Sequence, residues 1–301
     1  MPGPGNVRPN IRLRVAIQKS GRLSDRSLDL LRAAGLRIRI NGSGLYFRAS
    51  ELPIDILLVR DDDITGFVND GVCDMGIVGQ NVFEEYSCRR GPSEVDVRET
   101  LGFSRCRLAI AVPKLENYTG PQDLAGHRIA TSYRGLLQRF LDDNNVKASV
   151  VEMSGAVELA PKLGIADTIC DIVSSGATLE ANGLKAVETV LDSEALLIEN
   201  RAAMCPEKRE IAGRLLQRIR GVLASDETKY IMLNAPAKSL DRITELLPGA
   251  DAPTLIPLNG DRSLFAVHAV CRESVFWETM EGLKAAGASS ILVLPIEKMM
   301  V

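Results

Sequence analysis

Short apolar runs alternate with amphipathic segments over the first two thirds of the chain, and this alternation restricts the fold more than any other feature. The run IRLRVAIQ (11–18) predicts a strand, and LSDRSLDLLRAAG (23–35) predicts a helix that ends at its glycine. The runs IDILLVR (54–60) and CDMGIVG (73–79) read as the next strands. Strands that alternate with helices form βαβ units, so the pattern predicts an α/β fold with a mainly parallel sheet.

The same alternation starts again after a break at Gly120-Pro121. CDMGIVGQN (73–81) is similar to CDIVSSGAT (170–178), because in each a Gly stands five residues after the Asp. We therefore expect two related lobes that face each other across a cleft. The expected boundaries are a disordered Pro/Gly-rich tail over 1–10, lobe I over 11–108 and 186–226, and lobe II over 109–185.

From about Lys229 the predicted element order changes to βαββαβ, the ferredoxin-like motif, which we place in a third domain over 227–301. A module of this size docks readily on a partner. A regulatory or assembly role suits it at least as well as catalysis.

Composition and charge exclude several classes of function. The 301 residues are 46% hydrophobic, which is enough for two or three cores, and the net charge is −3 with a pI of about 5.6. Without a basic stripe or a long apolar run, we expect no nucleic-acid partner and no membrane span. The six Cys form no CxxC pair, and the N-terminal tail has no apolar segment of the signal-peptide kind, so we expect a cytoplasmic protein with reduced thiols.

The loop after the run ICDIV combines an acid with a row of hydroxyls. Free N–H groups at the start of a helix, hydroxyl donors and a glycine together make a phosphate site, and Asp171 is placed to accept hydrogen bonds from sugar hydroxyls. Alternatively, Ser175 and Thr178 only cap the helix and Asp171 ends the strand. Both interpretations fit the local sequence. The loop residues of the phosphate hypothesis are Ser174, Ser175, Gly176, Ala177 and Thr178.

A second candidate turn is QKSGRLS (18–24), in which Lys19 and Arg22 flank Gly21. Two cations beside free N–H groups suit a polyanion such as a pyrophosphate, and the carboxyl end of a strand is where open α/β sheets bind ligands. The alternative is a solvated turn with Ser24 as the helix cap.

Other acids and bases are weaker candidates. Acids in a first helical turn are favoured by the helix dipole alone, which accounts for Asp62 and Asp63. The histidines do not support a catalytic triad, since neither lies near a nucleophile in a known motif. The remaining candidates for the cleft are Arg60, Asp61, Asp74 and Glu158.

At this level of detail the chain resembles the ATP phosphoribosyltransferase family, which opens histidine biosynthesis. The resemblance covers the chain after its N-terminal tail, and its C-terminal module matches the long form, which needs no separate regulatory subunit. The segments that carry it are RLRVAIQKSGRLS, PIDILLVRDDDI, DGVCDMGIVGQNV, SGAVELAPKLGIADTICDIVSSGATLEANGL and GASSILVLPIEKM.

The resemblance implies that ATP and 5-phosphoribosyl 1-pyrophosphate (PRPP) give phosphoribosyl-ATP and pyrophosphate, with Mg²⁺ required and its protein ligands unassigned. It implies that residues 174–178 hold the ribose 5-phosphate and that Asp171 holds the ribose hydroxyls. Lys19, Gly21 and Arg22 would lie near the pyrophosphate or the ATP phosphates, so Asp171, Lys19 and Arg22 are the expected catalytic residues.

The resemblance also implies feedback inhibition by histidine at the C-terminal domain, through Asn234, Thr254 and Ser290. Asn234 departs from the Asp of some relatives. The family's long forms assemble as dimers and hexamers, so we expect a homo-oligomer. Because two lobes around a cleft also resemble periplasmic solute-binding proteins, the competing hypothesis is a two-lobed binding or amino-acid sensing protein without catalysis.

Overall fold

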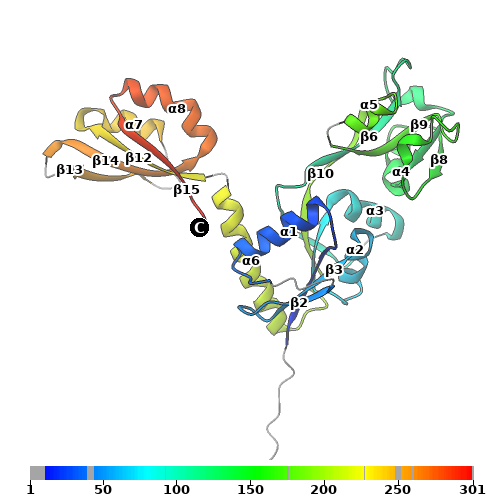
Figure 1. Ribbon diagram of the computed structural model, residues 1–301, viewed down its shortest axis with the longest axis horizontal. Coiled ribbons are helices and arrows are strands. Elements are labelled where there is room, and N and C mark those ends of the chain that lie inside the picture. The colour runs from blue at the N-terminus through cyan, green and yellow to red at the C-terminus, as the bar shows by residue number, and fades with distance from the viewer. Residues whose placement is uncertain are drawn as a thin grey trace, which may run out of the picture. The chain divides into compact units, whose positions relative to one another are not determined.

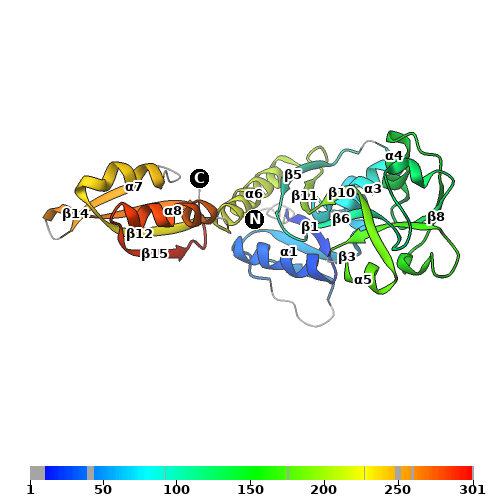
Figure 2. The same ribbon diagram turned by 90° about the horizontal axis from the view of Figure 1, so that it is seen from above.

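Figures 1 and 2 show the computed structural model of the chain. The structure describes residues 11–38, 44–91, 93–174, 176–226, 228–247, 252–258 and 261–299. The predicted tail over 1–10 and Ser175 lie outside the described residues. The chain divides into two compact units. The first ends at Arg214, the second begins at Leu215, and each is described by itself.

The first unit begins with a six-stranded sheet of order β2-β3-β1-β4-β11-β5. Its central strands β3, β1 and β4 are parallel, so their carboxyl ends meet at one edge of the sheet, while β2, β11 and β5 run antiparallel to their neighbours. The strands are β1 (Leu13–Gln18), β2 (Tyr46–Arg48), β3 (Ile54–Val59), β4 (Met75–Gly79), β5 (Asp96–Thr100) and β11 (Ala195–Glu199). The helices are α1 (Arg22–Ala33), α2 (Asp61–Asn69), α3 (Gln80–Arg90) and the first turns of α6 (Pro206–Asp226), which continues into the second unit.

The second sheet of this unit has five strands in the order β10-β6-β9-β7-β8. β7 is parallel to β8 and β9, whereas β6 is antiparallel to β9 and β10. The strands are β6 (Cys106–Pro113), β7 (Arg128–Thr131), β8 (Ser149–Glu152), β9 (Thr168–Val173) and β10 (Leu184–Ser193). The helices are α4 (Arg134–Asp143) and α5 (Ala177–Ala181), with 3-10 turns η1 (Pro121–Leu124) and η2 (Val157–Leu159).

The two predicted lobes are confirmed, but their boundaries and sheets differ from expectation. β6 pairs with β10 along its length, with Cys106 opposite Ser193 and Pro113 opposite Leu184, so both strands belong to the second sheet. The predicted lobe II over 109–185 is therefore too short at both ends. The chain crosses between the sheets through residues 101–105 and again at Glu194. Both sheets are mixed rather than mainly parallel, because β10 runs antiparallel to β6 in the second sheet and β11 runs antiparallel to β4 in the first.

The second unit confirms the predicted βαββαβ order, with an antiparallel sheet of order β13-β14-β12-β15. One sheet face carries Ile231, Leu233 and Val267, which are buried together with Phe276 and Leu283 of α8. Its elements are β12 (Thr228–Pro236), η3 (Ala237–Ser239), α7 (Leu240–Leu246), β13 (Thr254–Leu258), β14 (Asp261–Arg272), α8 (Glu273–Ala285) and β15 (Ser289–Pro295).

The boundary between the units lies earlier than the expected 226/227. The last turns of α6 belong to the second unit because residues after β15 bind them: Met299 N–H donates to the Gly221 carbonyl at 3.1 Å, and Ser225 Oγ donates to the Glu297 carbonyl at 3.1 Å. Within the described ranges, no helix combines the length and apolar composition that a membrane span needs.

Candidate active site

A tight turn at the carboxyl end of β1 aims the first turn of α1 into a cleft. Gly21 has a φ of 96°, a conformation that L side chains rarely adopt, and it is the N-cap of α1. The turn places Arg22 at the first helical position and Arg26 one helical turn later. Ser24 does not cap the helix as the solvated-turn interpretation required, because it is buried inside the first turn and α1 has no side-chain cap hydrogen bond.

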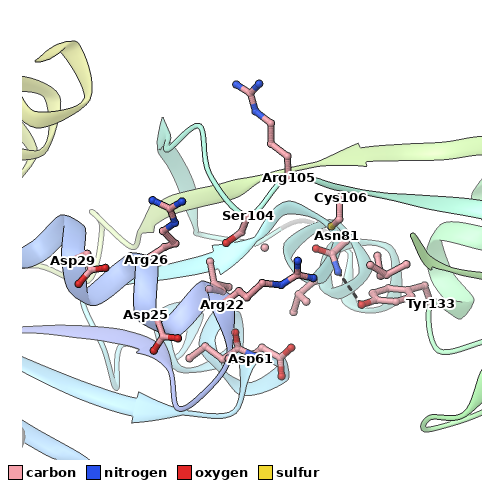
Figure 3. Close-up of a pocket in the computed structure, with 16 residues that line it drawn as sticks. Arg22, Asp25, Arg26, Asp29, Asp61, Asn81, Ser104, Arg105, Cys106 and Tyr133 are labelled. Carbon is pink, nitrogen blue, oxygen red and sulfur yellow. Dashed lines mark hydrogen bonds between the residues drawn. The ribbon is translucent and has the colours of Figure 1, made fainter. Parts of the chain in front are cut away.

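The cleft has a volume of about 690 Å³ and is lined by both lobes. From the first sheet and its helices come cations and acids together, and from the second sheet come a thiol, a phenol and an aliphatic side chain (Figure 3). A cleft with charges of both signs suits a ligand that carries phosphates at one end and donor groups at the other. Its lining residues are Gln18, Gly21, Arg22, Leu23, Asp25, Arg26, Asp29, Asp61, Gly79, Asn81, Val82, Ser104, Arg105, Cys106, Tyr133 and Ile172.

One wall of the cleft is a hydrogen-bonded chain across the two lobes. Asn81 Nδ2 donates to the Tyr133 phenol oxygen at 2.8 Å, the dashed line in Figure 3, and Ser193 Oγ donates to Asn81 Oδ1 at 2.9 Å. Burial raises the pKa of the Tyr133 phenol above its ordinary range, and the charge of Asp171 raises it further. Tyr133 is therefore protonated at neutral pH, and since Asn81 already donates to its oxygen, its own proton is available to a ligand.

A second cavity, of about 210 Å³, lies at the carboxyl end of β9. Gly176 has a φ of 80° and is the N-cap of α5, so the predicted strand, loop and helix are confirmed around it. A Cβ built on Gly176 would have no atom within 4 Å, which leaves the backbone open to a ligand. The lining residues are Arg22, Glu158, Asp171, Ile172, Val173, Ser174, Gly176, Thr178 and Leu179.

The alternative interpretation of this loop is not supported by the geometry. For the described residues, Thr178 lies inside α5, whose N-cap is Gly176 and makes no side-chain cap hydrogen bond, and β9 continues past Asp171 to Val173, so Thr178 is not the cap residue and Asp171 does not end the strand. Ala177 opens α5 but does not line the cavity.

Asp171 is half-buried, and its carboxylate faces conditions that oppose ionisation. Burial raises the pKa of Asp171 and the nearby charge of Glu158 raises it further, against one hydrogen bond at 2.8 Å from the Ile172 N–H. The two carboxylates in this small cavity repel each other, and a bound cation or a set of hydroxyl donors would reduce that repulsion.

Arg22 connects the two cavities. It lines both, and its Nη2 donates to Ser174 Oγ at 3.4 Å, which links α1 of the first sheet to the loop of the second. Ile172 also lines both cavities. Ligands in the two cavities would therefore both lie beside the Arg22 side chain.

Two predicted site residues, Lys19 and Arg60, line neither the cleft nor the second cavity. Lys19 is exposed and lines neither cavity, although its N–H bonds the Val59 carbonyl at 2.7 Å. Asp61 lines the cleft as expected, but Arg60 lines a third cavity of about 410 Å³. Tyr133 lines that cavity as well as the cleft.

Asp74 does not face the cleft. It is 3% exposed, accepts the Arg14 N–H at 2.8 Å and pairs with Lys208 Nζ at 2.8 Å. The prediction that Asp74 faces the cleft, which was based on its similarity to Asp171, is wrong because Asp74 precedes β4, whereas Asp171 lies inside β9. Asp74 therefore lies at the opposite end of the strand from the cleft, and its contacts are structural.

Several cleft residues escaped the sequence analysis. Asp25, Arg26 and Asp29 line the cleft from α1, and the spacing of Arg22, Arg26 and Asp29 on one helix face was a usable signal. Tyr133 gave a weaker one, since an aromatic residue is unusual at a helix N-cap. Asn81 gave none, because its partners come from distant parts of the chain.

The raised pKa of Asp171 predicts that the group lowers stability at neutral pH. The folded state holds the proton more tightly than the unfolded chain, so stability falls as pH rises from the ordinary carboxyl value of 3.8 through the folded-state pKa. We expect Asp171→Asn to unfold at a higher temperature than the native chain at pH 7, and the gap to narrow near pH 4. Thermal unfolding followed by circular dichroism measures this. Exposed Asp192→Asn is the control, and a gap that stayed constant with pH would contradict the prediction.

The predicted effector residues of the second unit lie on two parts of its sheet. β12 buries Ile231 and Leu233 on the helix side, so Met232 and Asn234 face the other side. Thr254 on edge strand β13 is opposite His268, which is opposite Met232, so Thr254 shares the uncovered face. Ser290 is on the other edge strand, β15, next to Ser289, which pairs with Asn234.

Comparison with known proteins gives two sequence models that together match most of the chain from residue 60 onward. The sequence model described as ATP phosphoribosyltransferase matches residues 60–221, and the one described as the HisG C-terminal domain matches residues 225–298. A solved structure, the ATP phosphoribosyl transferase (HisG:HisZ) complex from Thermotoga maritima, is 25% identical with a TM-score of 0.60. That match covers 71% of this chain and 98% of the other.

A second solved structure is the alkanesulfonate-binding protein SsuA from Xanthomonas axonopodis pv. citri, bound to MOPS. It is 16% identical with a TM-score of 0.43, and the match covers 96% of each chain.

Proposed function

The chain belongs to the ATP phosphoribosyltransferase family, and from this membership we propose where its two substrates bind and which residues act on them. The enzyme is a pentosyltransferase of histidine biosynthesis that joins ATP and PRPP to give phosphoribosyl-ATP and pyrophosphate. It is of the long form, since it carries the family's C-terminal domain.

PRPP is assigned to the second cavity, with its 5-phosphate on the loop from Ser174 to Thr178. The loop provides hydroxyls, the open backbone at Gly176 and the free N–H groups of a helix start, which together suit a phosphate group. Asp171 lines the same cavity, so it would lie near the ribose hydroxyls of a PRPP molecule whose 5-phosphate was held by the loop. Donated hydrogen bonds from the ribose diol would offset the burial of this carboxylate.

ATP is assigned to the larger cleft. Arg22, Arg26 and Arg105 provide positive charge for the triphosphate, and Asn81 and Tyr133 provide neutral hydrogen-bonding groups for the base. The observation that carries the proposal is the position of Arg22, which lines both cavities, so that one guanidinium reaches the leaving pyrophosphate as well as the second substrate.

Arg22 and Asp171 have complementary roles in the reaction. The bond from the ribose C1 to the pyrophosphate oxygen breaks, and a bond from C1 to the adenine N1 forms, through a transition state with positive charge on the sugar. Arg22 stabilises the negative charge that grows on the leaving pyrophosphate, and Asp171 orients the ribose. No nucleophilic side chain is needed.

Mg²⁺ is proposed to enter with the substrate phosphates. Among the described residues, no group of three or more His, Cys, Asp or Glu is placed to hold a metal ion. Asp171 and Glu158 share the second cavity, and one or two carboxylates plus phosphate oxygens are the usual ligands of Mg²⁺ in proteins. When bound, the ion would neutralise charge on the pyrophosphate.

Feedback inhibition by histidine is assigned to the second unit, on the uncovered face of its sheet. Thr254 and Ser290 lie on opposite edge strands, three strand spacings or about 14 Å apart. One histidine cannot contact both within a single unit, so we propose that a second copy of the chain completes the site, in a homo-oligomer of the dimer or hexamer kind. We place the enzyme in the cytoplasm, where ATP is supplied.

Release of pyrophosphate from PRPP tests the function directly. We expect release only when the enzyme, ATP, PRPP and Mg²⁺ are all present, and phosphoribosyl-ATP to form in equal amount. Ligand binding by calorimetry with no release of pyrophosphate under any of these conditions would contradict the proposed function.

A further inference from the structure

Helix α4 begins without a capping hydrogen bond from the side chain of its own N-cap residue. Its N-cap residue is Tyr133, whose side chain makes no cap hydrogen bond and lines the cleft instead. An N-cap side chain normally accepts hydrogen bonds from the second and third helical N–H groups, which here belong to Gly135 and Leu136.

Glu85 of α3 takes over this role from the other lobe. The Gly135 N–H donates to Glu85 Oε1 at 2.8 Å, and the Leu136 N–H donates to Oε2 at 2.8 Å. The Glu85 side chain is 12% exposed, and Arg89 Nε holds it by donating to Oε1 at 2.7 Å. A negative group is also favoured there by the helix dipole.

The two helices are close enough that only glycine fits at the contact. A Cβ on Gly135 would lie 2.7 Å from Cys88 Cβ and 3.2 Å from a Glu85 carboxylate oxygen. Asn81, Glu85 and Cys88 are spaced so that they share one face of α3. This face therefore contacts α4 along its first turn, and α3 and α4 belong to different sheets.

The same face of α3 also holds the Tyr133 side chain. Asn81 donates to the phenol oxygen at 2.8 Å, while Glu85 binds the backbone two and three residues further along the chain. Tyr133 is thus held at both its side chain and its following backbone. It stands between the cleft and the third cavity, both of which it lines.

We propose that Glu85 is a positioning residue of the reaction, which caps α4 across the lobe boundary and so holds Tyr133 in the wall of the ATP cleft. Glu85 acts through Tyr133 and touches neither substrate. The proposal rests on the assignment of ATP to the larger cleft, and it predicts an effect on one substrate and not on the other.

The first test compares Glu85→Ala with Glu84→Ala in the full chain. Glu84 is a matched control because it has the same charge, is the neighbouring residue and also reaches α4, through Arg139 Nη2 at 2.6 Å, but caps nothing. We expect the KM for ATP to rise about tenfold in Glu85→Ala. The KM for PRPP should stay within about twofold, and Glu84→Ala should change neither KM by more than about twofold. Glu85→Gln, which keeps one acceptor oxygen, should fall between the native chain and Glu85→Ala.

The second test uses the close contact at Gly135 and leaves Glu85 in place. Gly135→Ala should raise the KM for ATP because the added Cβ pushes the helices apart. Adding Cys88→Gly removes the obstructing atom and should bring the KM for ATP back towards the native value. Rescue of this kind separates positioning from a general loss of stability, which the second glycine would only increase.

The outcomes separate this inference from the proposed function. If the native chain releases pyrophosphate but Glu85→Ala leaves both KM values unchanged, or raises both equally, Glu85 is not a positioning residue. A rise confined to the KM for PRPP overturns the proposal as well, since Tyr133 would then belong to the other substrate. An inactive native chain would refute the function itself.

Discussion

Replacing Asp171 with Asn is expected to lower kcat/KM for PRPP by on the order of 100- to 1,000-fold while the fold persists. The substitution keeps the shape of the side chain but removes the charge that orients the ribose hydroxyls and any Mg²⁺ at the pyrophosphate. Among the described residues that line the second cavity, Glu158 is the only other carboxylate beside Asp171. Initial rates of pyrophosphate release at varied PRPP and saturating ATP measure the effect.

The control for this substitution is Asp192→Asn, an exposed position on β10 with the same chemical change. It should keep native kinetics. Binding of ATP to Asp171→Asn, measured by calorimetry, should also stay within about threefold of the native value, because the two substrates occupy different cavities. Native turnover in Asp171→Asn would remove this residue from the site.

Ending the chain at Asp226 is expected to abolish inhibition by histidine completely. Asn234, Thr254 and Ser290 all lie beyond that point, in a sheet whose apolar core is separate from the cores of the first unit. Calorimetric titration with histidine should show binding to the full chain and none to the shortened chain. Because the titration needs no turnover, it is informative even if the shortened chain has lost activity.

A full-length counterpart uses Thr254→Val, which keeps the shape of the side chain and removes its hydroxyl. It should weaken histidine inhibition by about tenfold and leave the uninhibited rate unchanged. The single tryptophan, Trp277, lies in α8, so its fluorescence reports on the second unit during the same titration. Histidine binding that survived in the shortened chain would place the effector site in the first unit.

Local sequence was sufficient for the two turns that carry the site. At Gly21 and at Gly176 a strand ends, the backbone takes a positive φ and a helix begins, and each of these steps has a signal within a few residues. The βαββαβ order of the last unit was predictable for the same reason. Periodicity and glycine placement act over short stretches of chain, so a reader of the sequence can recover them.

Pairing between distant strands was the first thing that local sequence did not reveal. β10 is an apolar strand like any other, and only its antiparallel pairing with β6 assigns it to the second sheet. Asp74 shows the same limit on the scale of one residue. Its motif repeats that of Asp171, but a shift of the strand relative to the motif puts one acid beside the cleft and buries the other on Lys208.

The residue types of the site were thus predictable from short motifs, whereas the positions of those residues relative to one another depended on contacts between the lobes. The acid, the hydroxyls, the arginine and the two glycines were visible in the amino-acid order, since strand ends and helix starts are local events. That Arg22 lines both cavities, that Asn81 binds Tyr133 and that Glu85 caps a helix of the other lobe became visible only after folding. These contacts join residues about 50 to 150 positions apart, and no local propensity encodes which distant groups a fold will bring together.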